Sequence, residues 1–486
     1  MTQLEPLTFK NLQDGLISEG AIAEDIYPNT AVSEAINLHF DKIGCATLRK
    51  GTTLLGDTGV LSGNILGLYE FRDSGSGTNN QIIAVNGTVA YYLSGSTWTS
   101  KRTGLTSGSK ARFSTYLDYV FMVNGTEATA IWDGNPSNSF VTTGNASGAP
   151  AGKYIENFRS RMWISGNTTY PDRLYYSSLP SSVTTPVITW DTDVATGDWI
   201  DISPSDGDNT TGLKRSKNFL LVFKKDHIYR VASISETEPD PTINVGTWSQ
   251  ESIVEAKDGV YFHHPSGFYK YENGLAQEIS KPIIDIVKAI TVTNYSKVSG
   301  FEDGDHIEWS VGDCTVNGVS YTNLCVRYTI STQSWTHYSY PTQHLVSSKY
   351  NDGTTIYNLV GDESGNILKI ATGNTDNSSA IQYSLIHKWL NFDGLLSTKK
   401  NINRILFTHK GGSGSKVAYQ KENDSVNDWS KSLKGEQLKE KDTGFDLSIK
   451  CKKLRFRVSG SSTGEPIIYN GFELLEGTTN KEIYDR

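Results

Sequence analysis

Cysteine is scarce in this sequence, and the four cysteines stand far apart. They are Cys45, Cys314, Cys325 and Cys451, in a chain of 486 residues. No CxxC pair and no histidine pair at metal-ligand spacing accompanies them, so the sequence indicates neither a zinc site nor a disulfide framework. We expect buried, reduced thiols that act as small apolar side chains, and no cofactor.

Long apolar runs are also missing. The longest clear one is Phe219–Phe223, far short of the ~20 residues that a helix needs to span a bilayer. The stretch Met1–Phe9 has neither the basic start nor the apolar centre of a secretory signal. We therefore expect no membrane span and no secretory signal.

Positive charge is in short supply over most of the chain, whose formal net charge is −8. Residues 376–486 hold 18 Lys and Arg against 14 Asp and Glu, whereas residues 1–375 hold 27 against 39. The body is thus acidic and the C-terminal part mildly basic. An acidic body argues against tight, sequence-independent DNA binding, which depends on cations that neutralise phosphates. It does not exclude a channel that repels DNA slightly and lets it slide.

Aromatic residues and glycine are abundant, with 25 Tyr and 45 Gly. Aromatic side chains favour pleated sheets, and glycine favours tight turns. The pattern predicts one short helix, Lys281–Ala289, with Pro282 in its first turn and Ile283, Ile286 and Val287 on one face. The composition otherwise predicts an all-β protein.

Hairpins of one kind recur along the chain. A short strand, an Asn-Gly or Asp-Gly turn and a strand with Val or Ile followed by an aromatic residue stand, for example, at Ala84–Tyr92 and Lys257–Phe262. Such turns accept the positive φ that two-residue hairpins need, and the alternating apolar residues bury one face. The turns at Asn86 and Asn124 lie 38 residues apart. A four-stranded propeller blade takes ~40–50 residues, so the repeats predict a propeller.

The predicted fold is a degenerate β-propeller of six or seven blades over residues 61–375, flanked by two further parts. Residues 1–60 are expected to form an extended arm that wraps the body or a neighbouring subunit and closes the ring. Residues 376–486 are expected to form a β-sandwich, with Lys431–Asp442 as an exposed charged loop. The approximate blade units are 63–105, 106–146, 149–203, 205–249, 250–281, 282–341 and 342–373. The predicted sandwich strands are Ile381–Trp389, Asn401–His409, Lys416–Lys421, Phe445–Lys450, Leu454–Ser459 and Ile467–Leu475.

Four groups of strand-and-turn residues follow one another in a characteristic order. They are Asn11–Leu16 with Ala35–Gly44 and Leu48–Gly51; Tyr154–Ser165 with Asp172–Ser178; Lys214–Arg230; and Lys453–Gly460 with Tyr469–Leu474. In this order they resemble the nozzle proteins of short-tailed, podovirus-like bacteriophages, also called tail hub or DNA-stabilisation proteins. The resemblance implies a homo-oligomer, a hexameric ring that extends the DNA channel below the portal and adaptor proteins. It also implies a place in the phage tail of the virion, assembled in the host cytoplasm.

Enzyme chemistry is poorly represented, and we expect no enzyme. No G-x-S-x-G, H-E-x-x-H or P-loop motif is present. His263–His264 lacks an acidic or cysteine partner at ligand spacing, and we read Asp201–Thr211 and Glu302–Asp305 as solvated loops with a cation site as the lesser alternative. Four residues could be read as the catalytic group of a sialidase-like enzyme. Arginine on strands beside aromatic residues is, however, more often stacked on a ring or ion-paired. That group is Arg159, Arg161, Arg173 and Tyr175.

Two strands alternate basic and aromatic residues, a pattern that can contact nucleic acid. The candidate contacts are Lys224, Lys225, Lys452, Lys453, Arg455 and Arg457. The alternative is an outward strand face whose charges guard a sheet edge against aggregation. The resemblance to nozzle proteins implies a structural virion protein that forms a ring around DNA for genome retention and ejection. The alternative is a virion-associated propeller that binds or degrades glycans on the host surface.

Overall fold

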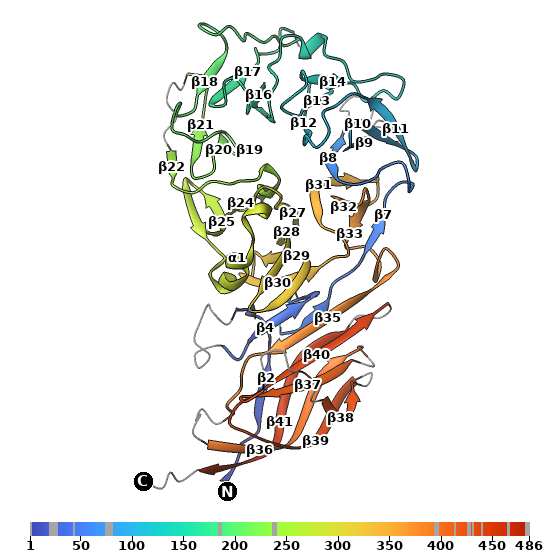
Figure 1. The fold of residues 1–486 in the computed structure, drawn as a ribbon, viewed down its shortest axis with the longest axis vertical. Coiled ribbons are helices and arrows are strands. Elements are labelled where there is room, and N and C mark those ends of the chain that lie inside the picture. The colour runs from blue at the N-terminus through green and yellow to red at the C-terminus, as the bar shows by residue number, and fades with distance from the viewer. Residues whose placement is uncertain are drawn as a thin grey trace.

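The computed structural model is an elongated all-β protein with a propeller at one end and a sandwich at the other (Figure 1). This confirms the predicted fold class. None of the helices in the described part of the chain is long and apolar enough to cross a bilayer. The structure describes residues 2–18, 28–41, 44–72, 81–182, 187–235, 241–392, 398–412, 415–424, 429, 432–438, 441–463 and 467–481.

Blades 1 to 5 are separate antiparallel sheets whose strands follow one another along the chain. Blade 2 has three named strands, and an isolated bridge between Ile131 and Val141 adds a partial fourth. The strands are β8 (Ile65–Phe71), β9 (Gln81–Asn86), β10 (Val89–Ser94) and β11 (Thr97–Arg102) in blade 1; β12 (Arg112–Tyr116), β13 (Tyr119–Val123) and β14 (Ala130–Trp132) in blade 2; β15 (Tyr154–Phe158), β16 (Arg161–Ser165), β17 (Arg173–Tyr176) and β18 (Trp199–Asp201) in blade 3; β19 (Gly212–Ser216), β20 (Phe219–Phe223), β21 (Ile228–Val231) and β22 (Pro241–Ile243) in blade 4; β23 (Val254–Ala256), β24 (Gly259–His264), β25 (Gly267–Glu272) and β26 (Leu275–Glu278) in blade 5.

Blades 6 and 7 complete the ring of seven blades, and the N-terminal arm closes it. Blade 6 consists of β27 (Ser299–Asp303), β28 (His306–Val316), β29 (Val319–Thr329) and β30 (Ser334–Ser339), and blade 7 of β31 (His344–Asn351), β32 (Ile356–Asp362), β33 (Ile367–Ile370) and the arm strand β7 (Thr52–Leu54). Strand β7 pairs with β33, with Thr52 opposite Ile370. The last blade therefore holds both ends of the propeller, and its edge is paired rather than exposed.

Large apolar side chains fill the spaces between neighbouring blades. Trp132 of blade 2 is 1% exposed, and its ring lies 6.5 Å from Phe71 and 5.5 Å from Tyr92 of blade 1. Phe121 of blade 2 belongs to a cluster with Ile164 of blade 3. Each such burial contributes about 1.5–3 kcal/mol. The middle strands of the blades are covered on both faces, so β13 and β20 are buried over four consecutive residues rather than in the alternation that the sequence analysis expected.

The predicted short helix is confirmed. A 3-10 turn, Lys281–Ile283, leads into α1 (Ile284–Ala289), and Ile283, Ile286 and Val287 are buried. A second single-turn helix, α2 (Val292–Tyr295), follows, and two further 3-10 turns lie at Gly144–Ala146 and Gln250–Ser252.

The C-terminal part is a β-sandwich of two sheets around an aromatic core. Phe407 lies at its centre, with ring centroids 5.7 Å from Phe445, 5.6 Å from Phe456 and 5.6 Å from Phe472. One sheet has the order β39-β36-β41, and the other joins β35, β40, β37 and β38. The strands are β34 (Thr375–Asp376), β35 (Ser379–His387), β36 (Thr398–Lys410), β37 (Lys416–Lys421), β38 (Ser432–Gln437), β39 (Lys441–Cys451), β40 (Leu454–Ser462) and β41 (Ile468–Lys481).

The charged stretch Lys431–Asp442 is not simply a loop, as the sequence analysis expected. Strand β38 occupies part of it and pairs with β37, and β39 begins at Lys441. Buried Leu438 follows β38, and its N–H donates to the carbonyl of Ser415. This stretch has only two apolar residues, Leu433 and Leu438, so the sequence carries no alternating apolar pattern from which a strand could be predicted. Residues 431 and 439–440 lie outside the described part of the chain.

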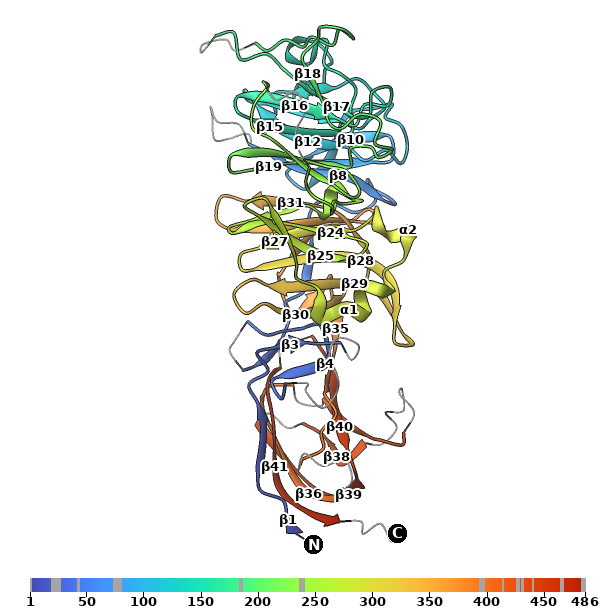
Figure 2. The same ribbon diagram turned by 90° about the vertical axis from the view of Figure 1, so that its left-hand side faces the viewer.

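The N-terminal arm contributes strands to both parts of the molecule. Strands β1 and β2 pair with β41 at the far end of the sandwich, and β3 and β4 lie between the propeller and the sandwich (Figure 2). Strand β4 pairs with β35 on one side and, in parallel, with β3 and β30. The arm strands are β1 (Thr2–Gln3), β2 (Leu7–Lys10), β3 (Gly15–Leu16), β4 (Ala31–Ile36), β5 (Leu38–His39) and β6 (Ala46–Leu48).

Candidate functional site

Arg49 joins the arm, blade 6 and the strand that leaves the propeller. Its buried guanidinium binds both carboxylate oxygens of Asp376, at 2.8 Å and 2.5 Å. Its remaining N–H groups donate to Asn37 Oδ1 and to the carbonyls of Lys50 and Ser339. Every donor of the guanidinium is therefore satisfied, which a buried arginine requires. We call Arg49, Asn37 and Asp376 the clasp.

The residues beside Arg49 suit this geometry. Asn37 has a φ of +58°, a conformation that asparagine tolerates, and its Nδ2 donates to the carbonyl of Gln382 in β35 at 2.7 Å. Gly51 approaches the outgoing chain so closely that a Cβ would lie 1.9 Å from the carbonyl oxygen of Thr375. The structure thus explains why the arm has an arginine at position 49 and, two residues later, a residue without a Cβ at position 51.

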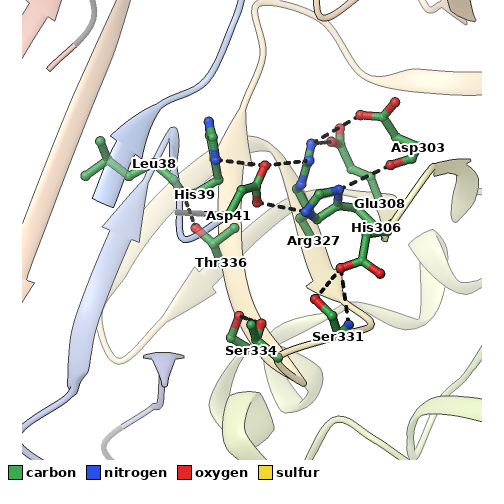
Figure 3. Close-up of polar contacts among 12 residues, drawn as sticks. Leu38, His39, Asp41, Asp303, His306, Glu308, Arg327, Ser331, Ser334 and Thr336 are labelled. Carbon is green, nitrogen blue, oxygen red and sulfur yellow. Dashed lines mark hydrogen bonds and ion pairs between the residues drawn. The ribbon is translucent and has the colours of Figure 1, made fainter. Parts of the chain in front are cut away.

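Asp41 holds a second polar contact between the arm and blade 6 (Figure 3). Its carboxylate lies 2.7 Å from Nε2 of His306 and 3.0 Å from Nδ1 of His39. Burial acts to raise the pKa of Asp41, but the hydrogen bonds from His306 and His39 outweigh it, and the pKa lies well below its usual range. The arm therefore presents an anion to blade 6 throughout the neutral range.

Arg327 extends this contact into blade 6 (Figure 3). The guanidinium lies 3.7 Å from Asp41, 3.7 Å from Asp303 and 3.8 Å from Glu308. Glu308 is 1% exposed, and burial, although opposed by Arg327 and Arg49, raises its pKa to about 7. One cation thus lies among three acids, of which Glu308 is the least solvated.

The axis of the propeller holds a channel lined by the first strands of the blades. Its cavity has a volume of about 570 Å³. Lys110 and Arg112 lie 2.9 Å and 2.7 Å from the largely buried Glu251 carboxylate, and Lys349 pairs with Glu302. Burial raises the pKa of Glu251, but the two cations outweigh this effect and lower it to about 2. The channel is therefore crossed by ion pairs rather than lined by charge of one sign.

A cleft of about 430 Å³ lies between blade 6 and the sandwich. The tip of the β28–β29 hairpin, helix α1, the arm and the sandwich each line part of it. Glu34 of the arm accepts hydrogen bonds from Tyr321 at 2.9 Å and Ser384 at 2.7 Å. Trp429 and Arg457 form the sandwich wall, so the cleft is both aromatic and charged.

The basic residues of β40 form a stacked ladder on the side of the strand that faces away from the sandwich core, and Arg455 and Arg457 line the cleft. Lys453 lies 4.8 Å and Arg455 4.5 Å from the ring of Trp389, and Arg455 and Arg457 lie 5.4 Å and 5.0 Å from that of Trp429. Leu454 and Phe456 between them point into the core. Of the predicted contacts here, Lys452, Lys453 and Arg457 are half-buried and Arg455 is buried.

The two predicted contacts in blade 4 differ from each other. Lys224 has no exposed surface, and its ammonium lies 2.9 Å from Asp172 and 2.8 Å from Asp206. This placement removes Lys224 from the candidate nucleic-acid contacts, because a buried, ion-paired ammonium cannot reach a phosphate. Lys225 is exposed, and its ammonium lies 4.8 Å from the ring of Trp248.

Three of the acidic residues that the sequence analysis considered as ligands of a cation form ion pairs with lysines instead. Asp206 of the 201–211 loop binds Lys224, Glu302 pairs with Lys349, and Asp305 lies 2.9 Å from Lys257.

His263 and His264 separate, since adjacent residues of a strand face opposite sides. His263 is buried against Phe268, whereas His264 lies 3.2 Å from Asp226. Burial lowers the pKa of His263 to about 3, so this ring is neutral.

The arginines of the sialidase-like group have ordinary structural partners. Arg173 lies between the rings of Tyr170 and Trp199, at 4.1 Å and 3.8 Å, and 3.6 Å from Asp201. Arg161 donates to the carbonyl of Ser177, and Arg159 to that of Asn218. These contacts match the stacked or ion-paired surface residues that the sequence analysis expected.

Sequence spacing did not reveal a cluster of Glu308, Cys325 and His344 between blades 6 and 7. All three are buried, and their donor atoms lie within 4.8 Å of one another. The residues come from β28, β29 and β31, so no short motif contains them. None of the four cysteines, all of which lie in the described part of the chain, forms a disulfide. Three are buried, and the partly buried Cys45 donates to Asn470 Oδ1 at 2.7 Å.

Comparisons with known proteins add little beyond the fold. No family model matches the chain, and no curated protein matches it. Solved structures similar to it include the computationally designed Ika8, YCF48 from Cyanidioschyzon merolae and Saccharomyces cerevisiae Sqt1. Their TM-scores are 0.40, 0.39 and 0.41, at 10%, 10% and 7% identity. The alignments cover 66%, 66% and 67% of this chain and 100%, 98% and 100% of theirs. At these TM-scores the similarity supports no inference about this chain. The seven-bladed propeller joined to a sandwich is defined by the arrangement of the sheets itself.

Proposed function

We propose that this chain is a structural protein of a phage tail, which forms a ring of copies that extends the DNA channel below the portal and adaptor. The observation that carries the proposal is the place of the N-terminal motif residues. Asn37, Asp41 and Arg49 belong to the stretches that resemble tail nozzle proteins, and all three lie in the joint between arm, propeller and sandwich.

A rigid joint suits a strut in a ring. The arm is paired into both parts, and the clasp fixes the strand that connects them. A subunit that withstands the pressure of packaged DNA must not bend between its domains. Buried, fully paired charges impose such a fixed geometry, because any hinge motion would expose or unpair them.

DNA would pass between copies rather than through the propeller. A cavity of about 570 Å³ is the size of a pocket for a small molecule and far too small for a duplex. Its ion pairs cross the axis. The acidic charge of residues 1–375 would weakly repel DNA sliding past them.

The test is assembly with a portal–adaptor complex of a short-tailed phage. We expect the purified chain, 53.5 kDa alone, to bind that complex in several copies and to form one particle in sedimentation velocity experiments. The portal without its adaptor serves as the control and should not bind. A chain that stays monomeric and binds neither would refute the proposal.

A further inference from the structure

The cluster of Glu308, Cys325 and His344 lies where blade 6 meets blade 7. Glu308 and Cys325 are on β28 and β29 of blade 6, and His344 begins β31 of blade 7. Their exposed fractions are 1%, 1% and 2%. A carboxylate, a thiol and an imidazole thus converge in a place without solvent.

The donor atoms of Glu308 and His344 are unsatisfied within the described residues. Both carboxylate oxygens and both ring nitrogens lack a hydrogen bond of ordinary geometry, although Tyr340 lies close enough to the Glu308 carboxylate to act against the rise of its pKa. Cys325 makes a long sulfur contact, 3.9 Å, to the carbonyl of Asn323, and a hydrogen bond with Ser310 only partly offsets the rise that burial causes in the pKa of its thiol. A buried polar group without a partner costs about 1–3 kcal/mol, and a charged one more. Such a cost at two adjacent groups indicates that a further group binds here.

The neighbouring cations do not fill this role. Arg327 lies 3.8 Å from Glu308 but is also shared with Asp41 and Asp303. Arg49 is saturated by Asp376. The two guanidiniums are therefore neutralised by other acids, and the Glu308–Cys325 pair can supply two negative charges of its own.

The spacing suits a metal ion. Three atoms no more than 4.8 Å apart share a point about 2.8 Å or less from each, so small side-chain rotations reach the 2.0–2.3 Å of zinc bonds. A set of one sulfur, one nitrogen and one oxygen donor excludes Mg²⁺ and Ca²⁺, which take oxygen donors, and favours Zn²⁺. Three protein ligands leave a fourth tetrahedral position for a further donor.

We propose that Glu308, Cys325 and His344 form a zinc site that joins blades 6 and 7 beside the ring closure. On binding, the Cys325 thiol proton leaves to solvent as the zinc–sulfur bond forms, and no electrons are exchanged. Burial raises the pKa of Glu308 to about 7 and that of Cys325 well above its ordinary value, so the metal would displace protons that these groups otherwise hold.

The test uses the full chain, treated with a chelator and titrated with Co²⁺ as a spectroscopic stand-in for Zn²⁺. We expect one Co²⁺ per chain, tetrahedral d–d absorption, a thiolate-to-cobalt charge-transfer band, and loss of these bands when Zn²⁺ is added. The Cys325→Ser variant should lose the charge-transfer band. The Cys314→Ser variant is the matched control, because Cys314 is a second buried cysteine of the same hairpin, and it should keep the band.

Thermal unfolding of the unaltered chain gives a second readout that needs no variant. Zn²⁺ should raise the unfolding midpoint by several degrees, and a chelator should reverse the rise. Three results would overturn the proposal: no stoichiometric Co²⁺ binding, a charge-transfer band that survives in Cys325→Ser, or a midpoint unchanged by Zn²⁺. Weak binding of several ions per chain would mean an adventitious ion only, and would overturn it too.

Discussion

The blades and the joint between arm, propeller and sandwich are held together in opposite ways. In blades 1 to 5, strands that are adjacent in sequence pair with each other, and apolar side chains such as Trp132 and Phe121 fill the spaces between sheets. At the joint, Arg49 and Asp376 stand 327 residues apart and meet as buried charges. Local pairs form at little loop-closure cost, whereas distant ones need partners of high specificity.

This difference means that the blades tolerate change and the joint does not. An apolar core accepts other apolar side chains of similar volume. A buried ion pair accepts few substitutions, because removing one partner leaves the other uncompensated. The joint should therefore be the place where single substitutions have the largest effects.

Loss of Arg49 should have the largest effect. The Arg49→Ala variant leaves Asp376 buried without its cation, and we expect the free energy of unfolding to fall by about 3–5 kcal/mol in urea titrations. The control is Arg404→Ala, since the Arg404–Asp446 pair is largely exposed and should contribute about 1 kcal/mol or less. Equal effects of the two variants would contradict a special role for the clasp.

Acid should destabilise the protein through its buried histidines. Burial lowers the pKa of His263, His337 and His387 to about 3. The unfolded chain takes up protons near pH 6.5 and the folded one does not, so stability is full above pH 6.5 and is lost as the pH falls toward 3. Each neutral ring contributes a slope of about 1.4 kcal/mol per pH unit in that window. In the chain without zinc, Glu308 acts in the opposite direction between about pH 4.5 and 7, because its pKa is raised.

The His263→Phe variant isolates one of these contributions. His263 packs on Phe268 with both ring nitrogens unpartnered, so phenylalanine suits its place. Urea unfolding at pH 6 and pH 5 should show a slope lower by about 1.4 kcal/mol per pH unit than in the unaltered chain. An unchanged slope would mean that His263 is charged in the folded protein.

A smaller effect is expected in the channel. The Glu251→Gln variant keeps the shape but leaves Lys110 and Arg112 without their anion, and we expect a loss of about 1–3 kcal/mol at neutral pH. The loss should vanish as the pH approaches 2, where Glu251 itself takes up a proton. Glu272→Gln is the control, because that carboxylate is half exposed beside Lys270.

The smallest effect concerns DNA. The Arg457→Ala variant should weaken binding of duplex DNA only a few-fold and reduce the salt dependence by about one ion. Arg404→Ala, also in the sandwich but outside the ladder, should leave both unchanged. If neither changes in Arg457→Ala, the ladder is a purely structural stack.

The parts that could be predicted from the sequence are those that depend on neighbours along the chain. The glycine turns at Gly87 and Gly318 have positive φ, as two-residue hairpins require, and they mark blades 1 and 6. Helix α1 could be predicted from Pro282 and the apolar residues that follow it.

The joint and the buried cluster could not be predicted, because their residues are far apart. Asp376 and Arg49 carry no local pattern, and Glu308, Cys325 and His344 lie on three strands of two blades. Lys224 is a second case that the sequence could not predict. Its position beside aromatic residues suggested an exposed strand face, yet the side chain lies in the interior, where Asp172 and Asp206 stabilise its charge. Side-chain partners that come from distant strands decide whether a charge lies inside or outside.

An image of the assembled particle tests the central claim most directly. Electron cryo-microscopy of the chain bound to its portal–adaptor complex should show several copies around a lumen coaxial with the DNA, with each propeller beside that lumen and the sandwich held in one fixed orientation. Isolated copies, or DNA density within the axis of a single propeller, would contradict the account.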